Sequence, residues 1–162
     1  MRIKIGDKLP SSEMFYLDQS NTVKKVDILD LCKDGKVIIL GMPGAFTKVC
    51  SALHLPGYIK NHELAKKKGI SKIICVAVND ANVMKAWGES QNVRDKILMV
   101  GDPFHNFTRS IGADVDKTER GLGIRSNRYT MLIENNNVIK IEEEKETGVC
   151  ELSAAESFLS TI

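Results

Sequence analysis

Three short apolar runs rich in β-branched residues constrain the fold of this chain most strongly. They cover Val37–Leu40, Ile73–Val78 and Ile97–Val100, and segments with helical periodicity separate them. Buried strands that alternate with helices are typical of βαβ units, which build a parallel sheet. Because a chain of 162 residues without repeats or linkers fits one core, we predict a single domain over residues 1–162.

The segments between these runs predict two helices. The first is expected over about Val49–Lys68, broken or kinked at Pro56-Gly57 and closed by Gly69, since proline interrupts a helix and glycine often ends one. Asp80 can cap the start of the second. Its predicted apolar stripe consists of Val83, Met84, Ala86 and Trp87.

The last third of the chain predicts a hairpin and a closing helix. Tyr129–Glu134 and Val138–Glu142 flank three asparagines, which adopt left-handed turn conformations at low cost. Ser153–Ile162 has the pattern of an amphipathic helix, and Thr118–Asn127 is expected to be the least regular segment. The predicted fold class is therefore α/β, with a central mixed sheet flanked by helices.

Composition excludes several classes of partner. With 43% hydrophobic and 27% charged residues and a net charge of +2, the chain has no basic block for nucleic acid and no apolar stretch for a membrane. The four cysteines show neither C-x-x-C nor a short metal-type spacing, so we expect no metal site. We expect a cytoplasmic protein, because the first residues lack the features of a secretory signal.

One cysteine lies where a strand is expected to turn into a helix. The run Pro43-Gly44-Ala45-Phe46-Thr47-Lys48-Val49-Cys50 follows five apolar residues. Unpaired N–H groups and the macrodipole at a helix start stabilise a thiolate over a thiol. The hydroxyl of Thr47 can reach the same sulfur, and Pro43 would stiffen the loop and shield it. A threonine N-cap above an inert buried cysteine fits the residues equally well.

These residues and several later segments of the chain resemble a known family. Pro-x-x-x-Thr-x-x-Cys is the active-site motif of peroxiredoxins, and the wider run is similar to their type II, or Prx5, branch. The resemblance continues in order along most of the chain, through His54-Leu55-Pro56-Gly57-Tyr58, Val78-Asn79-Asp80, Val83-Met84-Lys85-Ala86-Trp87 and Gly121-Leu122-Gly123.

The resemblance implies a thioredoxin-like fold and a thiol peroxidase that reduces hydrogen peroxide and small alkyl hydroperoxides. Cys50 would attack one peroxide oxygen and become a sulfenic acid. Thr47, Arg128 and the N–H of Cys50 would hold the two oxygens. Arg128 matches the family's active-site arginine, and Arg125 is a weaker candidate.

The same resemblance implies further features of the site. Pro43 would belong to the catalytic set, and Gly44 and Val49 would contact the substrate. No metal or organic cofactor would be needed. Where the family usually has proline, this chain has Lys48. The extra cation could favour the thiolate, although solvent screens an exposed lysine well.

Two cysteines are candidates to resolve the sulfenic acid. By pattern alone Cys75 is a buried strand residue, but it matches a resolving thiol of some plant-like type II enzymes. Cys150 resembles the C-terminal resolving cysteine of animal Prx5 proteins. We favour Cys75 slightly, while glutaredoxin with glutathione, or thioredoxin, could also supply the thiol. We assign no chemistry to Cys32.

The residues are also compatible with other functions. The same thiol could serve a peroxide sensor or redox-signalling protein without efficient turnover. A cysteine hydrolase could pair Cys50 with His54, four residues later, although a packing histidine is the simpler interpretation. Type II proteins tend to form homodimers through the surface around the active site, which here would include Phe46, Asn79, Asp80 and Gly121–Asn127.

Overall fold

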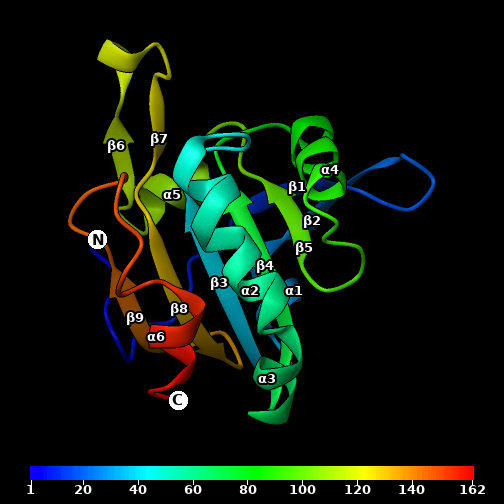
Figure 1. The fold of residues 1–162 in the computed structure, drawn as a ribbon, viewed down its shortest axis with the longest axis vertical. Coiled ribbons are helices and arrows are strands. Elements are labelled where there is room, and N and C mark those ends of the chain that lie inside the picture. The colour runs from blue at the N-terminus through cyan, green and yellow to red at the C-terminus, as the bar shows by residue number, and fades with distance from the viewer.

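The computed structural model describes residues 1–162, and one central sheet organises the molecule (Figure 1). Its strands are β1 (Glu13–Leu17), β2 (Val23–Asp27), β3 (Lys36–Met42), β4 (Ile70–Ala77), β5 (Leu98–Gly101), β8 (Tyr129–Glu134) and β9 (Asn137–Glu143). They lie in the order β2-β1-β5-β4-β3-β8-β9. β3 pairs parallel with β4, and β4 with β5, while the other neighbours are antiparallel. The predicted α/β class with a mixed sheet is confirmed.

Helices cover both faces of the sheet. They are α1 (Ile28–Cys32), the π-helix η1 (Cys50–His54), α2 (Leu55–Lys60), α3 (His62–Lys67), α4 (Ala81–Ser90), α5 (Asn106–Ser110) and α6 (Ala155–Leu159). One apolar core joins the sheet to η1, α2, α3, α4 and α6, and a second core joins the opposite face to α1 and α5 (Figure 1). None of these helices is long and apolar enough to cross a bilayer.

Several sequence predictions agree with these elements in detail. The three apolar runs lie in β3, β4 and β5 to within one residue, and most of their residues are buried. The hairpin is formed by β8 and β9, and the turn residues Asn135 and Asn136 have φ values of 49° and 65°, the left-handed region that asparagine tolerates. Asp80 caps α4 by accepting hydrogen bonds from the amides of Asn82 and Val83 at 2.8 and 3.0 Å.

The helix expected over Val49–Lys68 differs from the prediction. Pro56 lies at the start of α2 and does not break it; the interruption falls at Asn61, where φ is −94° and ψ is 14°. Before Pro56 the helix widens into η1, in which the Leu55 amide bonds to the Cys50 carbonyl. A proline lacks an amide hydrogen and crowds the preceding turn, so the wider π-turn accommodates it. Gly69, with φ of 83°, ends the helical segment as predicted.

Three further expectations are corrected. Ala86 is exposed and Val83 is half-buried, so the buried residues of α4 are Ala81, Met84, Trp87 and Gly88. The closing helix is shorter than predicted, because α6 covers only five residues. The segment expected to be irregular contains the 3-10 helix η2 (Thr118–Arg120) and β7 (Ile124–Ser126), which pairs with β6 (Asp114–Asp116) in a ribbon that projects from the body (Figure 1).

Candidate active site

A tight turn connects the end of β3 to η1. The amide of Thr47 bonds to the carbonyl oxygen of Gly44 at 3.4 Å, which closes a turn through Ala45 and Phe46. Phe46 has φ of 61°, an uncommon conformation for a bulky residue, and its side chain is 58% exposed. The Asn79 side chain accepts a hydrogen bond from the Ala45 amide at 2.9 Å and so fixes the turn against the end of β4.

Cys50 lies in the first turn of the helix that follows. The first hydrogen bond of this helix runs from the Ser51 amide to the Thr47 carbonyl at 3.0 Å, so the earlier amides have no intrahelical acceptor. The cysteine itself is 0% exposed. The Thr47 hydroxyl donates to the Gly44 carbonyl at 2.8 Å, and not to the sulfur as the spacing suggested.

Arg128, immediately before β8, brings a cation to this sulfur. Its Nη2 donates to Cys50 Sγ at 3.3 Å, although the two residues are 78 positions apart. Nη2 and Nε also donate to the Thr147 carbonyl at 2.8 and 3.2 Å, and Nη1 faces His54 Nδ1 at 3.2 Å. The structure therefore brings together the cysteine and the arginine that the sequence analysis paired.

The burial of Arg128 is unusual because no carboxylate neutralises it. The side chain is 1% exposed, and none of the ion pairs of the protein includes it. A buried cation without an anionic partner is costly. Its remaining partners are a carbonyl, an imidazole and the sulfur of Cys50, and of these only the sulfur can become an anion. The guanidinium therefore places a positive charge directly beside the sulfur, where it can stabilise negative charge during a reaction.

His54 is buried beside the same arginine. Burial, followed by the charge of Arg128, lowers the pKa of His54 from 6.5 to about 3, so the ring is neutral. Because arginine can only donate, Nδ1 is the acceptor and the proton resides on Nε2. Nε2 already carries a proton and Nδ1 already accepts from Arg128, so neither nitrogen can remove a proton from Cys50. This arrangement argues against the cysteine hydrolase.

The second arginine candidate does not reach the sulfur. Arg125 donates through Nε to the Leu122 carbonyl at 2.8 Å and through Nη1 to the Val78 carbonyl at 3.3 Å. The same Nη1 would lie 2.9 Å from a Cβ placed on Gly44, so this glycine leaves room for the guanidinium against the turn. Arg125 thus packs against the turn, while Arg128 contacts the sulfur.

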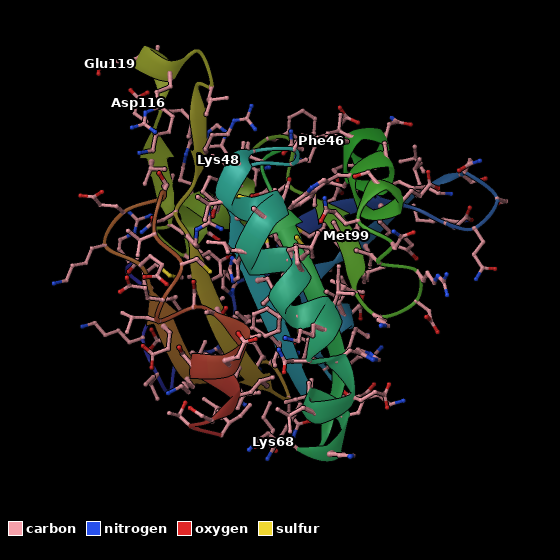
Figure 2. All side chains as sticks on the ribbon, viewed as in Figure 1. Phe46, Lys48, Lys68, Met99, Asp116 and Glu119 are labelled. Carbon is pink, nitrogen blue, oxygen red and sulfur yellow. The ribbon has the colours of Figure 1, made fainter.

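The other predicted site residues surround the turn. Pro43, directly after β3, is buried, and Val49, directly before Cys50, is half-buried. Lys48 is exposed and makes no ion pair. Figure 2 shows Phe46 and Lys48 at the same end of the molecule as the projecting ribbon.

The two candidate resolving cysteines differ in environment. Cys75 pairs with Leu40 and Leu40 with Thr130 across the sheet, so all three lie on the face covered by η1 and α2. Burial raises the pKa of Cys75 well above its usual range. Cys150, in the loop between β9 and α6, is half-buried, and burial raises the pKa of its thiol too. All four cysteines are free thiols.

A hydrogen-bond network behind Arg128 was missed by the sequence analysis. His54 Nε2 contacts the Thr130 hydroxyl at 3.2 Å, and the Tyr58 hydroxyl contacts Thr130 at 3.3 Å. Thr130 in turn donates to the Ser153 carbonyl at 2.9 Å. The available signals were the spacing of His54, one turn after Cys50, and of Thr130, two residues after Arg128. Either spacing alone is indistinguishable from ordinary packing.

Known proteins are similar to this chain in sequence and in fold. The chain matches the Redoxin family over residues 4–159. It is 37% identical to peroxiredoxin-2D of Arabidopsis thaliana, with 99% of this chain and 98% of the relative aligned.

Solved structures agree. Reduced Prx3 of Vibrio vulnificus in complex with H2O2 superposes with a TM-score of 0.92 and 40% identity over 98% of each chain. Peroxiredoxin 5 of Alvinella pompejana gives 0.84 and 31%, over 98% of this chain and 97% of that one. The chain therefore belongs to the Redoxin family and, within it, to the type II, Prx5-like peroxiredoxins with a thioredoxin-like fold.

Proposed function

We propose that Cys50 is the residue that reacts with peroxide in this thiol-dependent peroxidase. Membership of the peroxiredoxins gives the activity, the reduction of hydroperoxides with electrons from a thiol. One observation supports the assignment to Cys50 above all others. The buried guanidinium of Arg128, which has no carboxylate partner, lies 3.3 Å from its sulfur.

The proposed chemistry uses only the sulfur and the peroxide. The Cys50 thiolate attacks one oxygen, an S–O bond forms, and the O–O bond breaks. The second oxygen leaves with the bonding electrons and takes up a proton to become water or an alcohol. Sulfur supplies two electrons and becomes a sulfenic acid. Because the sulfur is buried, small hydroperoxides are the expected substrates.

In this proposal the surrounding groups align and stabilise the reacting oxygens. Arg128 carries a permanent charge and a fork of donors, which stabilise charge on the departing oxygen. The Thr47 hydroxyl already donates to the Gly44 carbonyl, so its oxygen is free to accept a hydrogen bond from the peroxide. The amide of Cys50, in the first helical turn, would donate to the same oxygens, and Val49 and Gly44 are proposed to contact the substrate.

A second thiol must then reduce the sulfenic acid. We propose Cys75, which lies on the sheet face beneath Cys50, as the first candidate and the half-buried Cys150 as the second. Attack on the sulfenic sulfur releases water and leaves a disulfide, which an external dithiol reduces. Thioredoxin, or glutaredoxin with glutathione, would supply those electrons.

We also propose a homodimer, with a cytoplasmic location. The exposed phenyl group of Phe46, at the site's rim, favours an apolar contact there. Asn79, Asp80 and residues 121–127 lie in the same predicted interface. The four free cysteines are consistent with a reducing compartment, although curated relatives include chloroplastic proteins. Fractionation of cells that express a tagged protein would test the location.

Activity measurements test the assignment of the site. Purified protein should consume hydrogen peroxide catalytically with dithiothreitol, and Cys50→Ser should abolish this consumption, whereas Cys32→Ser should not. Separate assays with thioredoxin and with glutaredoxin plus glutathione would identify the reductant. Stoichiometric oxidation of Cys50 without turnover in any of these assays would favour the peroxide sensor instead.

A further inference from the structure

His54 joins the arginine of the site to the sheet through two opposed nitrogens. Nδ1 lies 3.2 Å from Arg128 Nη1, and Nε2 lies 3.2 Å from the Thr130 hydroxyl. Thr130 uses its own hydrogen to bond the Ser153 carbonyl, so its oxygen accepts from Nε2. Thr130 and Arg128 thus agree on one tautomer, in which Nε2 carries the proton and Nδ1 accepts from the arginine.

The four residues form a compact arrangement built from two elements. Cys50 and His54 are one turn apart on the helix. Arg128 lies immediately before β8 and Thr130 is the second residue of that strand, so their side chains lie on the same face. The helix therefore carries both the sulfur and the imidazole that Arg128 contacts. A displacement of the helix moves these two partners of the guanidinium together.

The guanidinium needs this additional contact to have one orientation. Nε and Nη2 both donate to the single oxygen of Thr147, and this anchor on one edge leaves the plane free to tilt about that oxygen. The contact of Nη1 with His54 holds the opposite corner. With both anchors in place, the second hydrogen of Nη2 is directed at Cys50 Sγ.

We propose that His54 is a positioning residue for the reaction of Cys50, which aims the guanidinium of Arg128 at the sulfur and takes no part in proton transfer. The inference rests on the proposed role of Cys50. Its physical basis is that a catalytic group must be held close to one geometry, and a misplacement of about 1 Å can cost roughly 100-fold in rate.

Two amide substitutions separate the contacts of His54. In His54→Asn the side-chain oxygen replaces Nδ1 and can still accept from Arg128. In His54→Gln the amide nitrogen replaces Nε2 and keeps only the contact with Thr130. The readout is the second-order rate of Cys50 oxidation by hydrogen peroxide, followed by stopped-flow fluorescence of Trp87, whose indole bonds to Ser51 Oγ beside the cysteine.

We expect His54→Gln and His54→Leu to lower this rate by about tenfold or more, while His54→Asn stays within about threefold of the wild type. In an Arg128→Met background, His54→Leu should cause no further loss, because it acts through the arginine. If the peroxide rates of the His54 variants simply decreased in proportion to their melting temperatures, the proposal would be overturned. Equal rates for His54→Asn and His54→Gln would overturn it as well.

A second variant keeps the test decisive if the His54 variants do not fold. Thr130→Val removes the acceptor of Nε2, so that only the contact with Arg128 still holds the imidazole ring, and the peroxide rate should fall about two- to threefold with the fold retained. An unchanged rate in Thr130→Val would contradict the inference. If instead Cys50→Ser retained peroxidase activity, the proposed function would fail, and the two failures are thereby distinguished.

Discussion

At the scale of single residues, the burial of Arg128 and the burial of Cys50 each make physical sense because the other residue lies beside it. A guanidinium that is 1% exposed and lacks a carboxylate is unfavourable unless an anion approaches it, and a buried sulfur is a poor thiolate unless a cation approaches it. Each residue supplies what the other lacks. The same low-polarity surroundings that penalise either alone strengthen their interaction.

Lys48 provides a residue-scale prediction. Lys48→Pro restores the residue that type II relatives usually have and should change peroxide turnover less than about threefold. The lysine is exposed, so solvent screens its charge two residues from the sulfur. The same assay on Lys48→Ala separates loop stiffness from charge. A loss of activity in both variants would show a specific role for the lysine.

Gly41 in β3 provides a prediction for stability. A Cβ at this position would overlap the ring of Tyr129 from the neighbouring strand β8. Gly41→Ala should therefore lower the free energy of unfolding by about 1–3 kcal/mol, measured by urea denaturation. Gly148→Ala is the matched control, because nothing lies within 4 Å of its Cβ position and its stability should be unchanged. Equal stability of both variants would contradict the packing argument.

At the scale of elements, the loop between β9 and α6 is held by one carboxylate. Glu144 accepts hydrogen bonds from the amides of Glu151 and Ser153 at 2.7 and 2.8 Å and from the Ser153 hydroxyl at 2.8 Å. Burial alone would raise the pKa of Glu144, but these hydrogen bonds lower it. Held in this way, the loop places the Thr147 carbonyl beside Arg128, and it also contains Cys150.

This loop gives an element-scale prediction. Glu144→Ala removes the acceptor of three hydrogen bonds, so amide hydrogens of residues 147–153 should exchange faster, by roughly tenfold or more. The peroxide rate should also fall, because the Thr147 carbonyl is one anchor of Arg128. Hydrogen exchange measured by mass spectrometry checks the first effect. Unchanged exchange would show that other contacts hold the loop.

The resolving cysteine is tested at the same scale. If Cys75 resolves Cys50, mass spectrometry after stoichiometric peroxide should find the Cys50–Cys75 disulfide, and Cys75→Ser should stall turnover with thioredoxin. The buried, protonated Cys75 thiol would require local opening to react, so this step should be slow. A normal rate in Cys75→Ser together with a stalled Cys150→Ser would assign the role to Cys150.

The sequence predicted the elements with strong local signals. The strands β3 and β4 and the turn at Asn135-Asn136 were predicted because apolar runs and left-handed asparagines are local features. The break at Asn61 and the π-turn before Pro56 were not, since spacing does not distinguish a kink from a widened turn. The three-residue strands β6 and β7 are too short to show alternation.

The site was predictable only in part. The Cys50 motif is contiguous, and Arg128 followed from the family resemblance, because its approach depends on β8 lying beside β3. Thr130 was missed, and His54 was considered only as a packing residue or a hydrolase base, because their contact joins a helix and a strand that are 76 residues apart in the chain. Thr147 contributes only its backbone carbonyl, which no side-chain pattern reveals.

At the scale of the whole molecule, burial of a neutral histidine makes stability depend on pH. The pKa of His54 is about 3 in the folded protein and 6.5 as its ordinary value. The unfolded state binds the proton more readily, so this contribution is complete above pH 6.5 and is lost as the pH falls toward 3. Between pH 6.5 and 5 the loss is about 1–2 kcal/mol.

Urea denaturation at several pH values tests this dependence. Carboxylates with lowered pKa values, such as Glu144, contribute mainly below about pH 4.5, so the window from pH 6.5 to 5 isolates the histidine. His54→Asn should have nearly constant stability across this window, whatever its absolute value. A slope in His54→Asn equal to that of the wild type would contradict the assignment.

The proposed homodimer is a further property of the whole molecule. Phe46→Glu should shift the protein toward the monomer in analytical ultracentrifugation, because it places a charge in the predicted interface. Ile139→Glu is a matched control, since Ile139 is also exposed but lies in β9. Identical behaviour of Phe46→Glu and the control would place the interface elsewhere or show that the protein is monomeric.

The central claim is that Arg128 makes Cys50 reactive toward peroxide, and Arg128→Met tests it most directly. Stopped-flow oxidation of Cys50 by hydrogen peroxide should slow by roughly 100-fold or more, because the charge and its donors are lost. Stability should be retained or increased, since replacing a buried charge with an apolar side chain is often neutral or favourable. A folded Arg128→Met protein that reacts with peroxide within about twofold of the wild-type rate would contradict the account.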